Sequence, residues 1–254
     1  MSSSLKLLHD YNSDGSSSCT EDEETPVNEE NDVECRLPLP NSLKVNHKQE
    51  VNDEPEKHDG RVRCYPHQRG NWNSLIFIPY ESDASFDILC DQIIELCKPK
   101  VDLKRINDPH ISLTRTFILL YHWIDSFVLS VKKSLRSFHR FDVQFDNLKV
   151  YCNEEKTRTF LAFSVGLGKL EILKSVQLLD RCLSEYKLHP FYQEASFHMS
   201  ILWCLGDKKN ELEELLTQIN ETLTINLNES FDSAFQIRNY ICKIGNKIFD
   251  INLV

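Results

Sequence analysis

The sequence predicts a bilobal α+β fold in which two antiparallel sheets face a central cleft, with helices outside and an approximate internal two-fold symmetry. Two observations lead to this prediction. The segments 109–113 and 197–201 both contain the pattern His-apolar-Ser-apolar, and their histidines are 88 positions apart. Each segment lies within its own round of helix-like and strand-like stretches, so the two histidines occupy corresponding points of two similar lobes.

Residues 1–58 read as an acidic, Ser-rich tail that does not fold. They are rich in Ser, Asn, Asp and Glu, and residues 1–60 carry 15 acidic side chains against 5 Lys and Arg. Residues 61–254 carry 24 of each kind, so the net charge of −10 comes entirely from the first 60 residues. The predicted folded domain, 59–254, is therefore neutral overall and is able to present a local basic groove to RNA.

The first round of elements follows Gly60. Its apolar spacing predicts a buried strand ended by proline, an amphipathic helix, the first His/Ser strand, a long second helix, and two strands joined by a polar turn. In order, these elements cover residues 75–79, 86–97, 111–117, 122–137, 141–151 and 157–165.

The second round has the same character. It predicts a helix, the second His/Ser strand, another helix, and two closing strands around a Gly-Asn turn at 245–246. These elements cover residues 170–186, 197–204, 211–223, 231–240 and 247–253.

Composition excludes several classes of protein. The nine cysteines are scattered and none stands in a Cys-x-x-Cys pair, which argues against a zinc site and against a disulfide framework. No apolar run approaches the ~20 residues of a membrane span, and the first residues lack a signal-peptide hydrophobic stretch. We expect a soluble intracellular protein with free thiols.

The paired motif predicts the chemistry. Residues i and i+2 of a strand share a face, so His110 stands beside Ser112, and His198 stands beside Ser200. Two imidazoles across one cleft are able to act as base and acid at a phosphate ester, while hydroxyls hold the phosphoryl oxygens. One His-x-Ser is expected by chance among nine histidines, but the pairing favours catalysis over two ordinary strands. We therefore expect these four residues to be catalytic, without a metal.

The residues around the motifs resemble the U6 small nuclear RNA phosphodiesterase family, within the two-histidine (2H) phosphoesterase superfamily. The resemblance runs from about residue 37 to the C-terminus. The matching segments are 60–72, 137–141, 155–160, 191–193, 196–200, 203–207 and 245–247. It implies the bilobal fold and a nuclear 3′-to-5′ exoribonuclease that trims the uridine-rich 3′ end of U6 spliceosomal RNA. In many members the product ends in a 2′,3′-cyclic phosphate.

The resemblance also implies substrate-binding residues. Tyr192 would stack on a terminal base, and Ser196, Phe197 and Met199, which surround the second histidine, would help to bind the substrate. Glu154 stands where the family motif leads us to expect glutamine. An ionised carboxylate only accepts hydrogen bonds whereas an amide also donates them, so this difference bears on the preference for uridine.

The implied reaction is transesterification by the 2′-hydroxyl, so RNA should be cut and all-deoxy DNA should not. The sequence leaves open which histidine is the base and whether the cyclic phosphate is then opened. Two alternatives share the motif: a 2′,3′-cyclic nucleotide phosphodiesterase or other RNA-end-processing 2H enzyme, and a non-catalytic RNA-binding adaptor. We expect a monomer that acts on RNA without a cofactor or a membrane partner. The basic stretch 61–69, and Lys156 with Arg158, fit either RNA contacts or structural ion pairs.

Overall fold

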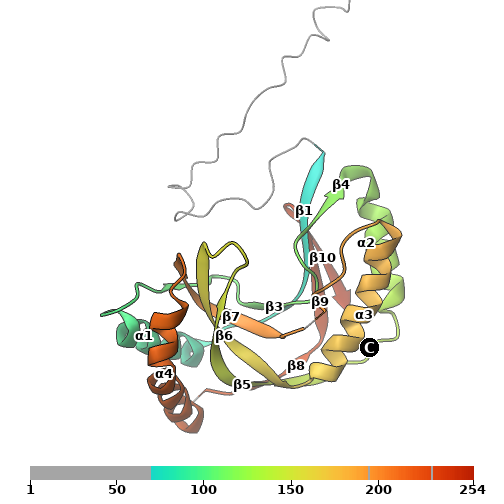
Figure 1. The fold of residues 1–254 in the computed structure, drawn as a ribbon. Coiled ribbons are helices and arrows are strands. Elements are labelled where there is room, and N and C mark those ends of the chain that lie inside the picture. The colour runs from blue at the N-terminus through green and yellow to red at the C-terminus, as the bar shows by residue number, and fades with distance from the viewer. Residues whose placement is uncertain (1–69, 194, 230) are drawn as a thin grey trace, which may run out of the picture. The chain divides into compact units, whose positions relative to one another are not determined.

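The computed structural model describes residues 70–193, 195–229 and 231–254 (Figure 1). The predicted tail at 1–58 and the basic stretch at 61–69 lie outside these residues. Within the described part, no helix is long and apolar enough to cross a membrane.

Ten strands, four α-helices and one 3-10 helix make up this part of the chain. The strands are β1 (Asn71–Pro79), β2 (Lys104–Arg105), β3 (His110–Ser112), β4 (Phe117–Leu120), β5 (Phe141–Cys152), β6 (Arg158–Leu167), β7 (His198–Leu205), β8 (Ala234–Ile237), β9 (Asn239–Ile244) and β10 (Lys247–Asn252). The helices are α1 (Ala84–Cys97), α2 (Ile124–Ser134), α3 (Lys169–Glu185), α4 (Lys209–Glu229) and the 3-10 helix η3 (Tyr121–Trp123).

The strands form one curled, antiparallel sheet in the order β10-β9-β1-β3-β7-β6-β5-β8, with β4 beside β1 and β2 beside β7 (Figure 1). The predicted α+β class and two-lobed arrangement are confirmed. The two expected sheets are joined into one, however, because the His/Ser strands β3 and β7 pair directly with each other. The approximate two-fold axis therefore passes between these two central strands.

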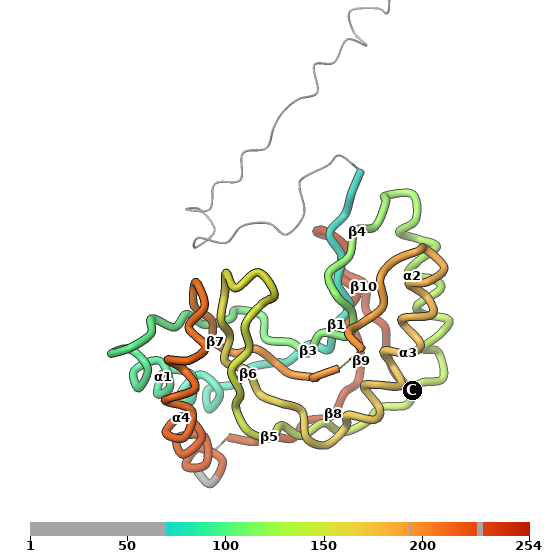
Figure 2. Tube along the Cα trace, viewed as in Figure 1, coloured from blue at the N-terminus to red at the C-terminus, as the bar shows by residue number. Residues whose placement is uncertain are grey.

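The helices cross between the halves of the sequence. α1 follows β1 in the chain but packs with α4, whereas α3 follows β6 but packs with α2 (Figures 1 and 2). On one side, Asn226 of α4 donates to Gln92 of α1 at 2.7 Å. On the other, the Ser175 hydroxyl of α3 lies 2.5 Å from the Tyr240 hydroxyl of β9. Each lobe thus contains a helix from each half, which a reading of two consecutive rounds did not predict.

Local sequence explains most element boundaries. α1 begins where the Asp83 carboxylate accepts from the backbone N–H of Phe86 at 2.8 Å, which satisfies one free donor of the first turn. The predicted Gly-Asn hairpin is present between β9 and β10. Gly245 adopts φ +58° there, and a Cβ at this position would lie 2.5 Å from Cε3 of Trp72.

Two predicted strands differ from the structure. The first His/Ser strand, expected at 111–117, ends at Ser112, and a bend then leads into the separate strand β4. The strand expected at 231–240 is divided into β8, which pairs with β5, and β9, which pairs with β1. β3 and β4 both pair with β1, but only β3 also pairs with β7. Between β8 and β9 the chain leaves β5 for β1. Apolar alternation alone does not record such changes of partner.

Candidate active site

The pairing of β3 with β7 sets the geometry of the two His-x-Ser motifs. Ile111 lies opposite Met199 in this antiparallel pair. His110 is therefore opposite Ser200, and Ser112 is opposite His198. The two histidines occupy diagonal positions, for which the Cβ atoms stand about 7 Å apart. The motifs, 88 positions apart in sequence, are direct neighbours in the sheet.

The two motifs turn their polar residues to the same face of the sheet. Ile111 and Met199, between the motif residues, are 1% and 0% exposed and belong to the core. The histidines and serines, on the opposite face, are half-buried. Because side chains alternate along a strand, the apolar residues fix both strands to the core while the motif residues lie on the open face.

The histidine rings are held in the same way at both positions. Nδ1 of His110 lies 2.8 Å from the carbonyl oxygen of Asp108, and Nδ1 of His198 lies 2.6 Å from that of Ser196. A carbonyl oxygen only accepts, so the proton of each neutral ring is on Nδ1. Nε2 of each ring is then the nitrogen that accepts a proton as a base, or that releases one when the ring is charged.

Each imidazole also packs against an aromatic ring. The rings of Phe77 and His110 are 4.8 Å apart at 49°, and those of Tyr151 and His198 are 4.1 Å apart at 18°. The Tyr151 hydroxyl is in turn 3.1 Å from the Ser196 hydroxyl. The roles of Phe77 and Tyr151 are not apparent from the sequence, because each lies in a different strand from the histidine that it contacts.

Both histidines favour the neutral form. Burial is the main cause that lowers the pKa of His110 below its ordinary value of 6.5, and the nearby Lys243 charge adds to it, while Asp108 opposes the shift. Burial likewise lowers the pKa of His198, and the charge of His110 adds to that shift. The influence of one imidazole on the other is consistent with their diagonal placement.

The two serine hydroxyls are available to a ligand. Neither Ser112 nor Ser200 forms a side-chain hydrogen bond with another described residue, although both side chains are half-buried. A half-buried hydroxyl is able to donate to an oxygen of a bound anion without first giving up a protein partner. Two nitrogens that can exchange protons and two free hydroxyl donors on one face fit acid–base chemistry at a phosphate ester.

Tyr192 lies on the segment that leads into β7. Its ring is 44% exposed, and the guanidinium of Arg115 lies over it, 3.7 Å from the ring centroid. Nε of Arg115 is buried and has no hydrogen-bond partner among the described residues. Arg115 follows the first motif by three residues, and it was not singled out from the sequence.

The other predicted substrate-binding residues differ in their placement. Ser196 contributes its carbonyl to His198 and its hydroxyl to Tyr151. The side chains of Phe197 and Met199, 6% and 0% exposed, point into the core, because they alternate with the motif residues. A substrate can reach only the backbone of these two, so side-chain contacts are not expected there. Their part in substrate binding stays a prediction, and it would involve their backbone atoms.

Glu154 is not beside the catalytic residues. It is exposed in the turn between β5 and β6, and its carboxylate makes no hydrogen bond or ion pair with a described residue. In the same turn, Lys156 forms an ion pair with Asp207 at 3.3 Å, which supports the structural interpretation of that lysine. Arg158 has no such partner within the described part, and its guanidinium lies 5.6 Å from the ring centroid of Phe160.

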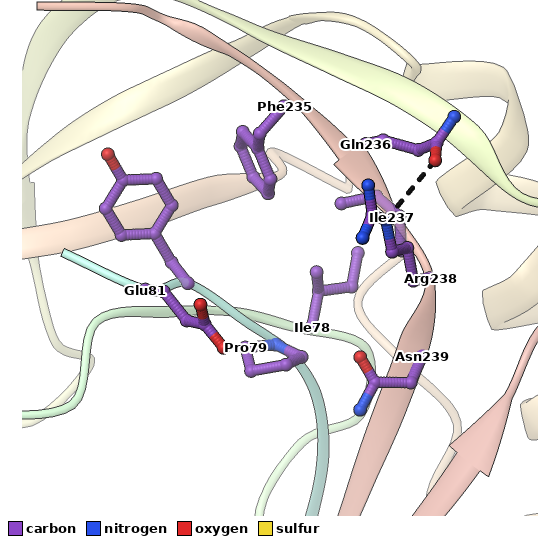
Figure 3. Close-up of a pocket in the computed structure, with 9 residues that line it drawn as sticks. Ile78, Pro79, Glu81, Phe235, Gln236, Ile237, Arg238 and Asn239 are labelled. Carbon is purple, nitrogen blue, oxygen red and sulfur yellow. Dashed lines mark hydrogen bonds between the residues drawn. The ribbon is translucent and has the colours of Figure 1, made fainter. Parts of the chain in front are cut away.

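A separate hollow of about 260 Å³ lies between the end of β1 and β8 (Figure 3). Glu81 and Arg238 are the charged residues that line it, and Nε of Arg238 donates to Gln236 at 3.4 Å. The hollow contains none of the predicted site residues. Across the described residues, no group of three or more His, Cys, Asp and Glu side chains is placed to hold a metal ion.

Comparisons with known proteins show which proteins this chain is similar to. A sequence family described as "HVSL: Uncharacterised conserved protein" matches residues 37–252. U6 snRNA phosphodiesterase 1 of Xenopus laevis is 38% identical over 204 residues, which is 80% of this chain and 82% of that protein. The human U6 snRNA phosphodiesterase 1 is 36% identical over 228 residues, which is 86% of this chain and 84% of that protein.

A solved structure shares the fold. Kluyveromyces marxianus Usb1, determined with uridine monophosphate, superposes with a TM-score of 0.56 at 13% sequence identity. The match covers 71% of this chain and 98% of that one. At this identity the likeness concerns the fold, and it agrees with the curled antiparallel sheet and the outer helices described above.

Proposed function

The chain belongs to the U6 small nuclear RNA phosphodiesterase family, and from that premise we propose that it shortens the uridine-rich 3′ end of U6 spliceosomal RNA as a 3′-to-5′ exoribonuclease. The curated relatives carry the phosphodiesterase activity and the RNA in their names. The two His-x-Ser motifs, brought side by side on the open face of β3 and β7, provide the chemical groups that such an enzyme needs.

The reaction is transesterification. Nε2 of one histidine takes the proton from the 2′-hydroxyl next to the scissile phosphate, and the 2′-oxygen forms a bond to phosphorus. The bond from phosphorus to the 5′-oxygen breaks, and Nε2 of the other histidine protonates that oxygen. Ser112 and Ser200 donate to the non-bridging oxygens, where negative charge increases. The product RNA ends in a 2′,3′-cyclic phosphate, and no step requires a metal ion.

The observation that carries this proposal is the register of Ile111 with Met199. This register puts each histidine opposite a serine of the other motif, which supports the proposal that both imidazoles act at one phosphate. The matching Nδ1 contacts to backbone carbonyls point the reactive nitrogens away from the chain. Random pairing of two surface histidines would not give both rings the same support.

Further parts of the proposal follow from the family. Tyr192 stacks on the base of the terminal nucleotide, with Arg115 supporting the other face of its ring. Ser196 positions His198 and Tyr151. The protein acts in the nucleus as a monomer, with 59–254 as the catalytic domain and 1–58 as an acidic tail.

The test is cleavage of an RNA that ends in about ten uridines, with an all-deoxy copy as control. We expect stepwise shortening of the RNA, a cyclic phosphate in the mass of the product, and no cleavage of the DNA. A single change of the end group without shortening would favour a cyclic phosphodiesterase. Binding without any cleavage would favour an adaptor, and either result would overturn the proposal.

A further inference from the structure

A hollow of about 390 Å³ adjoins the catalytic pair on the side of His110. Six of the residues that line it matter here: Lys104, Asp108, His110, Arg158, Phe160 and Trp203. They come from β2, from β3 and the segment before it, from β6, and from β7. We call this hollow the β6–β7 groove.

The groove continues the face that carries the catalytic residues. Ala162 lies opposite Ser200, and two residues further along β6 Phe160 lies opposite Trp203. An irregularity in the β6–β7 pairing between these positions adds one residue to β7, which keeps Trp203 on the same face as Ser200. Trp203 is 6% exposed and forms the floor, whereas Phe160 is half-buried and borders the opening.

Arg158 is the cation of the groove that has no ion-pair partner among the described residues. Nearby cations are already engaged: Arg105 contacts Asp87 and Asp91 at 2.6 Å each, and Lys156 contacts Asp207 at 3.3 Å. The carboxylate of Asp108 is the acidic group among the lining residues.

The position of Arg158 fits a phosphate other than the scissile one. It lies four residues along β6 from Ala162, the neighbour of Ser200, so the two Cα atoms are about 13 Å apart. A groove with a cation and an aromatic ring at its rim has the features that bind single-stranded RNA, in which phosphates and bases alternate. Phe160 lies between Arg158 and the catalytic pair.

We propose that the β6–β7 groove binds the RNA on the 5′ side of the scissile phosphate, with Arg158 contacting a phosphate of that segment and Phe160 contacting a base. This inference rests on the proposed function. An exonuclease that works from the 3′ end has one nucleoside without a further phosphate on one side of the cut, and the whole remaining chain on the other. The remaining RNA chain carries further phosphates, so it suits the end of the site that has the unpaired cation Arg158. At the Tyr192 end, the Arg115 guanidinium lies against the tyrosine ring.

The test compares two substrates, UpU and UpUpUpU, with the variants Arg158→Gln and Lys156→Gln. UpU has no phosphate beyond the scissile one, whereas UpUpUpU has two. The Lys156 variant is the matched control, because it removes the same charge two residues away, from a side chain that does not line the groove.

We expect Arg158→Gln to lower kcat/KM for UpUpUpU about three- to tenfold, mainly through KM, and to leave UpU unchanged. The slope of log kcat/KM against log salt for UpUpUpU should become shallower by about 0.7, the value for one lost phosphate contact on a single strand. Lys156→Gln should change neither substrate by more than about twofold.

Equal losses on both substrates, or no loss on UpUpUpU, would overturn the groove assignment while leaving the proposed function intact. A wild-type protein that cleaves neither substrate would overturn the proposed function and the groove with it.

Discussion

His110→Asn separates the catalytic role of the imidazole from its structural role. The amide nitrogen of asparagine is three bonds from Cα, as Nδ1 of histidine is, so the variant can still donate to the Asp108 carbonyl. It has no atom at the place of Nε2. The change therefore removes the nitrogen that transfers protons and keeps the hydrogen bond that holds the side chain.

Two magnitudes follow from these contacts. Loss of one positioned acid or base costs about 10²–10⁴-fold in rate, or about 2.7–5.4 kcal/mol of activation free energy. The retained hydrogen bond keeps its share of the folding free energy, and the lost packing on Phe77 costs about 0.5–1.5 kcal/mol. We expect a large loss of rate with a shift in Tm of only a few degrees.

Single-turnover cleavage of a fluorescent oligouridine RNA measures the rate. Fluorescence anisotropy with a 2′-deoxy sugar at the cleavage position measures binding, which should stay within about threefold of wild type. His139→Asn, at an exposed histidine outside the site, is the matched control and should leave both unchanged. Because the histidines act together, the variant with both His110→Asn and His198→Asn should be little slower than the slower single variant. A rate for His110→Asn within tenfold of wild type would refute the reasoning.

Four further predictions concern the same face and its support. The pKa values of His110 and His198 are both lowered, so the base stays neutral to lower pH and the acid loses its proton at lower pH. The value of kcat/KM should therefore peak below pH 6.5, and a peak above pH 7 would contradict this. The same shifts mean that the folded state binds fewer protons, so their contribution to the free energy of unfolding is present above pH 6.5 and is lost as the pH falls, which urea titrations at several pH values would detect. Tyr151→Leu should lower kcat about tenfold by releasing the His198 ring, whereas Tyr151→Phe, which keeps the stacked ring, should lower it less; equal losses in steady-state assays would assign the effect to the hydroxyl instead. Met199→Ala should reduce the free energy of unfolding by about 2–5 kcal/mol, because Met199 is fully buried behind the motif; a loss below 1 kcal/mol would show that this core collapses around the gap.

The sequence was sufficient to predict the motif residues and the face that they share. Alternation along a strand is local, so it shows that Ile111 and Met199 are buried while the residues beside them are not. The predicted Gly-Asn hairpin is equally local, and it is confirmed.

Register and helix placement were not accessible in the same way. The sequence predicts two sheets that face each other, but backbone pairing of β3 with β7 depends on contacts between distant segments. The rings that flank the histidines likewise come from distant strands of the same sheet. Phe77 of β1 is opposite Ser112 of β3, and the ring of Tyr151 in β5 contacts that of His198.

The exchange of α1 and α3 between the lobes also escaped prediction. Each helix has the apolar spacing of a surface helix, and that spacing is the same whichever lobe the helix covers. The burial of Phe197 and Met199, by contrast, could be predicted from the sequence. Their positions in the alternation already indicated the core, but the resemblance placed them with the substrate-binding residues.

The strand β1 lies between β3 and β9, and β9 is made from residues 239–244. During synthesis the ribosome must therefore release residues 239–244 before the second edge of β1 is paired. A message truncated after the codon for Ser200 but before those for β9 yields a polypeptide that retains both His-x-Ser motifs but leaves one edge of β1 bare. Such an edge is prone to aggregation and to recognition by cellular quality control. Late nonsense mutations should then behave like early ones, although every catalytic codon has been read.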